Sequence, residues 1–238
     1  MSMMYKFFPV FMFFLTSFSP IEHKITPTKA IAAASTKSDF EMKAESIYSH
    51  LNANNFSLPN LQSFAEGLEG FYSLKEKGLI KRDILTLVDF SLSSNVKRLW
   101  VIDLTTNTIL YNSLVAHGRN TGDEFANSFS NSPESFKSSL GFYATGEIYN
   151  GKHGASLKLD GLEKGVNDSA RERAVVMHGA DYVAESFIKS NHRLGRSLGC
   201  PAIPVALTKE IINTIKGKSC LFIYHPSRSH KAIAKFVS

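Results

Sequence analysis

A cysteine within a segment of turn-forming residues is the first feature that suggests chemistry. Cys200 lies in "GRSLGCPAIP" (residues 195–204) and is one of only two cysteines in the chain of 238 residues. Cys220, in contrast, lies in the apolar run "SCLFIY". A thiol held in a turn can face a cleft and act as a nucleophile. The alternatives are simple burial of Cys200 or a disulfide between the two cysteines.

A thiol nucleophile needs a base, and His178 is the best candidate because the pKa of imidazole lies near neutrality. His178 ends the apolar run "RAVVM", and Gly179 follows it. This position predicts an imidazole at a strand end, with room for another backbone segment beside Gly179. The intervening 21 residues are enough for a loop to return Cys200 to His178. Considered alone, His178 would be a structural histidine; combined with the cysteine turn, it is interpreted as a catalytic base.

The residues around the cysteine suggest how a site could be shaped. Gly199 permits backbone angles that other residues resist, so the amides of Gly199 and Cys200 could donate to a developing oxyanion. Ser197 could support the turn or donate a proton. Arg196 could bind a substrate carboxylate in bidentate fashion, or it could be a solvated surface arginine.

Three further residues are weaker candidates for substrate binding. His117 and Arg119, in "VAHGRNTG", could line the same cleft or cap a turn. His153, in "YNGKHGASL", lies between glycines and is placed near the substrate. No histidine or carboxylate pair has metal-ligand spacing, and the two cysteines are far apart, so neither a metal nor a cofactor is predicted.

The predicted elements give an α+β fold that is mostly β. Apolar residues at helical spacing predict a helical hairpin over residues 39–51 and 61–77, and a short helix over 208–215. Residues 120–141 are polar and predict a long loop, which is often functional. Short runs rich in β-branched and aromatic residues predict strands within 84–90, 98–104, 108–118, 141–149, 155–162, 173–179 and 219–226.

The first residues predict an export signal. Lys6 precedes an apolar stretch over residues 7–18, which is too short to span a bilayer. Residues 1–34 are therefore interpreted as a signal peptide cut after Ala34 or near Ser19, the alternative being an uncleaved interfacial anchor. Once the signal is removed, no stable membrane span is expected. The rest divides into a helical hairpin (35–82), which packs on a β-rich domain (83–238). Export predicts a periplasmic or cell-wall location.

The formal net charge of +6 favours anionic surroundings. No dense run of lysine and arginine is interleaved with aromatic residues, so no nucleic-acid partner is predicted.

The phrases "VVMHGADYV" and "GRSLGCPAIP" together resemble the murein L,D-transpeptidase catalytic domain-like family, within the L,D-transpeptidase catalytic-domain superfamily. The phrases "VAHGRNTG", "FSNSPESFKSSLGFY" and "GKHGASLKLDGLEKGVNDSARERAVVMHGA" strengthen the likeness. The resemblance covers residues 79–238, and the helical hairpin more loosely. It implies a β-rich catalytic domain in which Cys200 is the nucleophile, His178 is the general base and acid, and backbone groups near Gly179 orient the imidazole.

The implied reaction is ping-pong acyl transfer on peptidoglycan stem peptides. The thiolate would attack the L,D-amide before the terminal D-Ala, and an amine or water would then take the acyl group. The sequence departs from many family members, because Leu198 replaces a histidine and "PAIP" replaces a segment containing arginine. Arg196 is a hypothetical replacement for that arginine. The alternatives are a non-catalytic peptidoglycan-binding wall protein and an L,D-carboxypeptidase.

Overall fold

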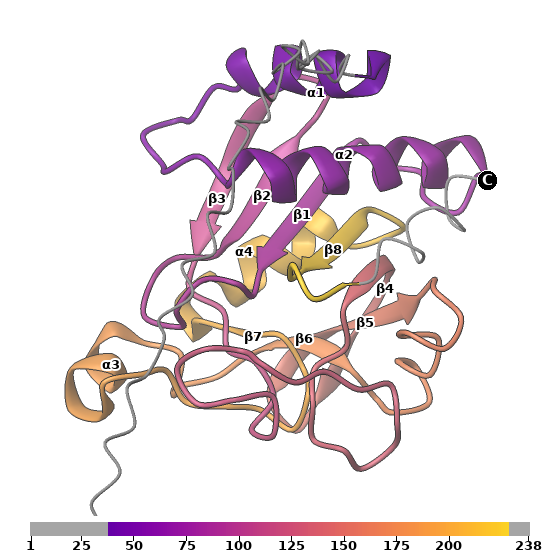
Figure 1. The fold of residues 1–238 in the computed structure, drawn as a ribbon. Helices are drawn as coiled ribbons and strands as arrows, with labels where there is room; N and C mark the ends of the chain where they lie inside the picture. The colour runs from indigo at the N-terminus through magenta and orange to yellow at the C-terminus, as the bar shows by residue number, and fades with distance from the viewer. Residues whose placement is uncertain (1–37, 229–238) are drawn as a thin grey trace, which may run out of the picture. The chain divides into compact units, whose positions relative to one another are not determined.

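A computed structural model describes residues 38–228, so the predicted signal peptide lies outside the described residues. The described chain contains eight strands and four helices, which confirms the predicted sheet-rich α+β fold (Figure 1). In chain order the elements are α1 (Asp39–Ser49), α2 (Leu61–Glu76), β1 (Ile84–Asp89), β2 (Leu99–Asp103), β3 (Thr108–Ser113), β4 (Gly141–Gly151), β5 (Gly154–Gly161), β6 (Val176–Gly179), α3 (Glu185–Asn191), β7 (Ala202–Ile203), α4 (Val205–Ile215) and β8 (Cys220–Tyr224).

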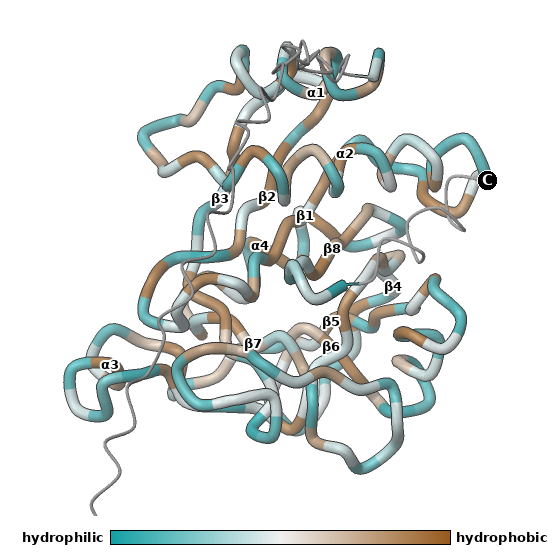
Figure 2. The backbone as a smooth tube through the Cα atoms, viewed as in Figure 1, coloured by the Kyte–Doolittle hydropathy of each residue, from teal (hydrophilic) through white to brown (hydrophobic). Residues whose placement is uncertain are grey.

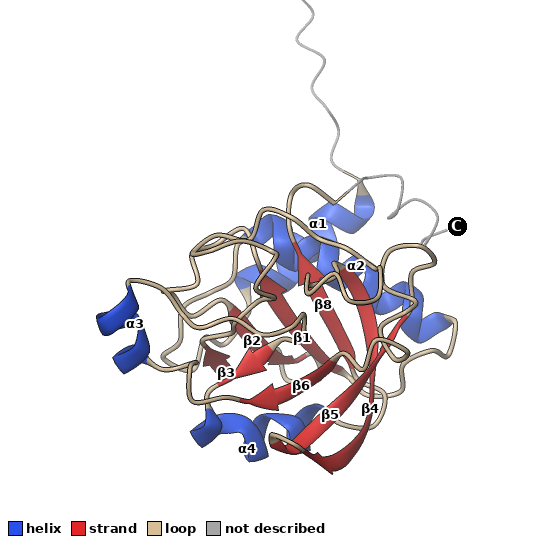
Figure 3. Ribbon diagram, turned by 90° about the horizontal axis from the view of Figure 1, so that it is seen from below, coloured by secondary structure: helices blue, strands red, loops and turns tan. Residues whose placement is uncertain are grey.

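All eight strands form one mixed sheet in the order β3-β2-β1-β8-β4-β5-β6-β7. The pairs β1–β8 and β6–β7 are parallel, and the other neighbours are antiparallel. Strand β8, near the end of the described chain, therefore lies between β1 and β4 and joins the two halves of the sheet. Helices α1 and α2 lie on one side of the sheet and α4 on the other (Figure 3).

The residues of β8 alternate between two hydrophobic cores. Phe222 and Tyr224 pack with α1 and α2, whereas Leu221 and Ile223 pack with α4. Every residue of β8 is buried, because helices cover both faces of the sheet there. In Figure 2 the central strands are largely brown, and the loops at the edge of the sheet are largely teal or white.

Helix α2 approaches the sheet closely. Asn60 caps its N-terminus by accepting a hydrogen bond from the Gln62 amide. Gly70 lies directly over the Phe142 ring, and a Cβ atom at this position would overlap that ring. The ring of Phe142 in turn stacks on Phe222, with centroids 4.1 Å apart. A side chain at position 70 would therefore push α2 away from β4 and β8.

Two elements were not predicted. Helix α3 has no buried residue, so it carries no apolar periodicity that could reveal it. Strand β7 has only two residues and is defined by its pairing with β6. Helix α4 begins at Val205, before the predicted start, because the helix follows directly after Pro204, which occupies the N-cap position.

Candidate active site

His178 lies on β6, and Cys200 lies in the turn that leads into the neighbouring strand β7. Strands β6 and β7 are parallel, and His178 pairs with Ala202, so Cys200 lies two residues before the partner of His178. The parallel pairing of two short strands therefore brings together residues that are distant in sequence.

The His178 imidazole is held in one tautomer. Its Nδ1 lies 2.9 Å from the carbonyl oxygen of Gly179. Because a carbonyl can only accept, Nδ1 carries the proton and Nε2 keeps its lone pair. The residue is only 3% exposed, and burial lowers the pKa of its imidazole. The bond to Gly179 partly opposes this shift, and the nearby His153 adds to it. His178 is thus suited to accept a proton at Nε2.

The Cys200 thiol is half-buried against the chain that leads into β6. Its Sγ accepts from the Val176 amide at 3.4 Å and lies 3.8 Å from the Ala174 carbonyl. Burial raises the pKa of the thiol, and the Val176 amide and Arg173 only partly offset the effect. Among the described residues, no hydrogen bond joins Cys200 to His178. The resting thiol is therefore protonated, contrary to the lowered pKa expected of many reactive cysteines, and it needs a base.

Neither cysteine forms a disulfide. Both are free, and Cys220 is completely buried in the core beneath α1 and α2. The structure therefore lacks the Cys200–Cys220 disulfide that the sequence left open as an alternative.

The turn before Cys200 is fixed by its own polar groups. The Ser197 hydroxyl accepts from the Gly199 amide at 3.0 Å and donates to the Cys200 carbonyl at 2.6 Å. Gly199 has φ +128°, and a Cβ atom there would lie 2.9 Å from the Lys137 carbonyl. Only glycine suits this backbone conformation and this close approach. Ser197 therefore supports the turn.

The amides of the turn differ in availability. Because the Gly199 amide already donates to Ser197, it is not free for a substrate. Among residues 38–228, the Cys200 amide donates to no other residue, but it interacts with the sulfur of its own side chain and lowers the pKa of that thiol. Of the two amides predicted to stabilise an oxyanion, only the Cys200 amide lacks a partner on another residue in this conformation.

Arg173 is a site residue that the sequence did not reveal. Its guanidinium donates to the carbonyls of Ser130 and Lys137, at 2.9 Å and 2.7 Å, and to the Ser139 hydroxyl at 2.6 Å. These acceptors are uncharged, so the positive charge of Arg173 remains available to lower the pKa of Cys200. Its position depends on the loop between β3 and β4, which no local pattern predicts.

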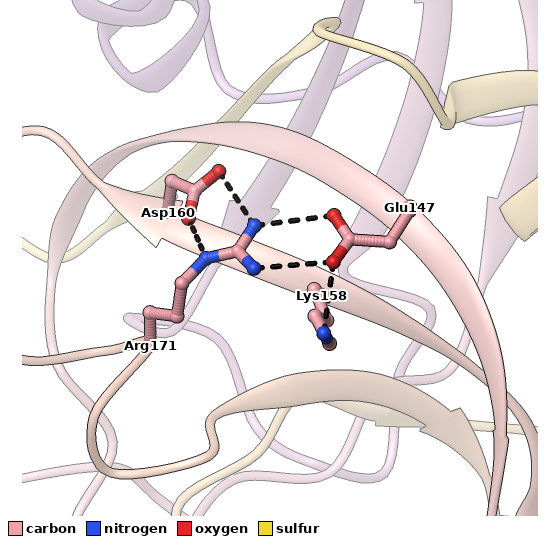
Figure 4. Close-up of polar contacts among 4 residues, drawn as sticks. All are labelled: Glu147, Lys158, Asp160 and Arg171. Atoms are coloured by element: carbon pink, nitrogen blue, oxygen red, sulfur yellow. Dashed lines mark hydrogen bonds and ion pairs between the residues drawn. The ribbon is translucent and has the colours of Figure 1, made fainter.

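Arg171 fixes the segment before β6, which also contains Arg173, to the sheet. It forms ion pairs with Glu147 and Asp160, and Lys158 also pairs with Glu147 (Figure 4). The Arg171 and Lys158 side chains lower the pKa of the Glu147 carboxyl to about 2. Arg171 thereby joins the chain before β6 to β4 and β5, and Ala174, which contacts the thiol, follows three residues later.

The weaker candidates lie in different environments. Arg196 donates to the Asp123 carboxylate at 2.6 Å and to the carbonyls of Arg119 and Gly122, so it is already occupied by the loop after β3. The exposed Arg119 stacks over Phe136, with Cζ 4.2 Å from the ring centre. Neither guanidinium is thus free of protein contacts.

His117 is a core residue in this structure. Its side chain is 1% exposed, and its ring nitrogens contact Arg98 at 2.8 Å and the Gly122 carbonyl at 3.3 Å. The sequence left open whether His117 lines the cleft or caps a turn, because a local pattern cannot show into which side of a loop a side chain points. His153, in contrast, does lie beside His178, with ring centres 4.4 Å apart.

The burial of His117 predicts a loss of stability in acid. Burial and the charge of Arg98 lower the pKa of His117 to about 4. The unfolded chain therefore binds this proton more readily, so the stabilisation is complete above the unfolded pKa of about 6.5 and is lost as the pH falls towards 4. We expect this histidine to account for about 3 kcal/mol of unfolding free energy between pH 7 and pH 4.

Urea unfolding at the two pH values measures this contribution. His117→Asn keeps an oxygen that can accept from Arg98 but cannot titrate, so its unfolding free energy should depend less on pH than that of the wild type. Carboxylate titration is common to both proteins and cancels in the comparison. An equal pH dependence in the two proteins would contradict the assignment.

Comparison with known proteins assigns the family. Residues 57–224, well over half of the chain, match the L,D-transpeptidase catalytic domain family. The chain therefore belongs to this family, and membership supports a peptidoglycan transpeptidase-like function. A search of curated proteins gives no match.

The chain is similar to solved structures that include an L,D-transpeptidase from Mycobacterium smegmatis, with 10% identity and a TM-score of 0.37. The match covers 60% of this chain and 59% of that protein. An L,D-transpeptidase from Xylanimonas cellulosilytica has 9% identity and a TM-score of 0.35, with coverages of 79% and 94%. The helical cell shape determining protein of Campylobacter jejuni has 15% identity and a TM-score of 0.38, with coverages of 72% and 60%.

Residues 38–228 contain neither a candidate membrane span nor a candidate metal site. No helix in this range has the length and apolar character required to cross a bilayer. Within the same range, no three histidine, cysteine or acidic side chains are grouped so that they could hold a metal ion.

Proposed function

We propose that the protein is a cysteine-dependent acyltransferase that acts on peptidoglycan stem peptides. One observation carries the proposal: the paired strands β6 and β7 hold a histidine and a thiol. His178 on β6 keeps the lone pair of Nε2, and the half-buried thiol of Cys200 lies just before β7. Family membership supplies the substrate class, because the matched family consists of L,D-transpeptidase catalytic domains.

In the proposed first step, the thiol proton passes to Nε2 of His178. The Cys200 sulfur attacks the carbonyl carbon of the L,D-amide before the terminal D-Ala. The Cys200 amide donates to the oxyanion that forms. The carbon–nitrogen bond then breaks, His178 returns the proton to the leaving nitrogen, and D-Ala departs from a thioester.

In the second step, the amine of another stem peptide or a water molecule attacks the thioester. His178 accepts a proton from the attacking group, and the sulfur leaves as a thiolate that is reprotonated. Attack by the amine forms a crosslink, whereas attack by water trims the stem. This scheme is acyl transfer with a covalent intermediate, and it requires neither a metal nor a cofactor.

Domains of this family usually act on the cell wall outside the cytoplasm, and we propose the same location for this protein. The predicted signal peptide over residues 1–34 would provide export to the periplasm or cell wall. We also propose that residues 35–82 support a catalytic domain over residues 83–238, since α2 packs on β1 and β8.

A second candidate function is non-catalytic peptidoglycan binding. The raised pKa of Cys200 favours it, because a protonated thiol is a weak nucleophile. His178 favours catalysis, since it can remove that proton when a substrate is bound.

Mass spectrometry of the protein with disaccharide-tetrapeptide muropeptides tests the proposal. We expect D-Ala release and a tripeptide acyl adduct on the peptide that contains Cys200. Crosslinked dimers among the products would indicate transpeptidation, and tripeptide alone would indicate L,D-carboxypeptidase activity. Muropeptide binding without either adduct or D-Ala release would contradict enzymatic function and support the binding protein.

A further inference from the structure

The β4–β5 hairpin places a second imidazole over His178. The rings of His153 and His178 stack with centroids 4.4 Å apart and an interplanar angle of 21°. His153 is otherwise an exposed residue at a hairpin tip, yet its ring lies on a side chain that is only 3% exposed. An exposed histidine that covers a buried candidate base requires a functional or structural explanation.

Strand register places the tip of the β4–β5 hairpin near the strand of His178. The β4–β5 pairing extends to Gly151 and Gly154, so Lys152 and His153 form the tip of the hairpin. On the other side of β5, Ser156 pairs with His178. His153 therefore precedes the partner of His178 by three residues and lies at the tip of the hairpin, just before β5. Figure 3 shows β5 between β4 and β6.

The remaining surroundings of His178 are largely uncharged. Ser156 from β5 and Ala202 from β7 are its neighbours in the sheet, and Thr208 of α4 lies beside Gly179. The titratable group in contact with His178 is thus His153 from the hairpin, whose ring stacks on the imidazole. Cys200 lies in the turn before β7, and its sulfur contacts Val176 and Ala174.

We propose that His153 is a positioning residue for the base: its ring covers one face of His178, excludes water from it and holds Nε2 in a fixed direction. This inference rests on the proposed function of His178 as the base. His153 itself neither donates to nor accepts from the reacting groups. The contribution is one of orientation and desolvation, for which a flat ring is sufficient.

Removal of the His153 ring has two expected consequences. Water would reach the exposed face of His178, so the desolvation that lowers its pKa would weaken. The ring would also gain rotational freedom. Since stacked aromatic pairs contribute modestly, we expect the rate of D-Ala release near neutral pH to fall roughly three- to tenfold. The acid limb of the pH–rate profile should move to higher pH in the same variant.

The test compares His153→Ala, which removes the ring, with His153→Phe, which keeps a ring without titratable nitrogens. Nitrogen-15 NMR of labelled histidine reports the pKa and tautomer of His178, and this measurement does not require activity. In His153→Ala, the pKa of His178 should rise towards its ordinary value, and the Nδ1–H tautomer should become less dominant. In His153→Phe, the tautomer and most of the rate should be retained. Lys152→Ala, at the same exposed hairpin tip, is the matched control and should change neither quantity.

Two outcomes would overturn the inference. If His153→Ala left the pKa and tautomer of His178 unchanged, the His153 ring would neither exclude water from His178 nor orient it. If His153→Phe lost as much rate as His153→Ala, the imidazole nitrogens would be the functional groups and a positioning role would be wrong. Failure of the proposed function is distinguishable, because the NMR response would persist in a protein that never releases D-Ala.

Discussion

Replacing Cys200 with alanine is expected to abolish the covalent adduct with a tetrapeptide stem or a carbapenem. The proposed intermediate is a thioester on this sulfur, and Cys220 cannot substitute because it is fully buried in the core beneath α1 and α2. Removal of a nucleophile usually costs at least about a thousandfold in rate, so D-Ala release should fall by at least that factor. Intact-mass spectrometry and a D-Ala assay measure the two effects.

Cys220→Ala is the matched control for this experiment. It also removes one thiol, but from a position that no substrate can reach, so adduct formation should persist. Thermal unfolding of both variants separates loss of chemistry from loss of fold. D-Ala release by Cys200→Ala at the wild-type rate would contradict the proposed mechanism.

His178→Asn should lower the rate of acylation about 10²- to 10⁴-fold at neutral pH. Asparagine can still donate a side-chain N–H to the Gly179 carbonyl, as Nδ1 of His178 does, but it lacks a base at the Nε2 position. The loss should be severe because burial raises the pKa of the thiol, and few molecules then carry a thiolate without assistance.

The pH dependence of this variant is a sharper test than its rate. Wild-type activity should be lost in acid once His178 binds a proton, at a pH below its ordinary pKa because burial lowers that pKa. In His178→Asn this acid limb should disappear, and the rate should instead rise with pH as the thiol ionises. The two rates should therefore converge at alkaline pH.

His192→Asn is a matched control for the histidine substitution. His192 is exposed and caps the C-terminal end of α3 in a left-handed conformation. Asparagine tolerates this conformation. Its pH–rate profile should equal that of the wild type. A wild-type acid limb in His178→Asn would show that another group is the base.

The sequence predicted the elements whose residues carry a strong local pattern. Strand β8 is recognisable because all its residues are apolar, and α2 because its apolar residues recur at helical spacing. The family resemblance is confirmed by the match over residues 57–224. The roles assigned to Cys200 and His178 stay predictions; the structure places His178 on β6 and Cys200 in the turn before β7.

Features that depend on contacts between distant segments were not predictable. Strand β7 is defined by its pairing with β6, and Arg173 acquires its position from the loop between β3 and β4. His117 lies in a polar segment that could line a cleft or cap a turn, and the structure buries it beside Arg98. In each case the local sequence identifies the residue type, whereas the tertiary structure decides which way the side chain points.

The position of β8 has a consequence for how the protein folds. Leu85 pairs with Cys220, so more than 130 residues of chain must close into a loop before these neighbours meet. Closing so long a loop is entropically costly, and folding with such distant contacts is slow. Until β8 docks, β1 and β4 both present unpaired edges that can recruit other chains. Loss of β8 by proteolysis would therefore divide the sheet at its centre rather than shorten it at an edge.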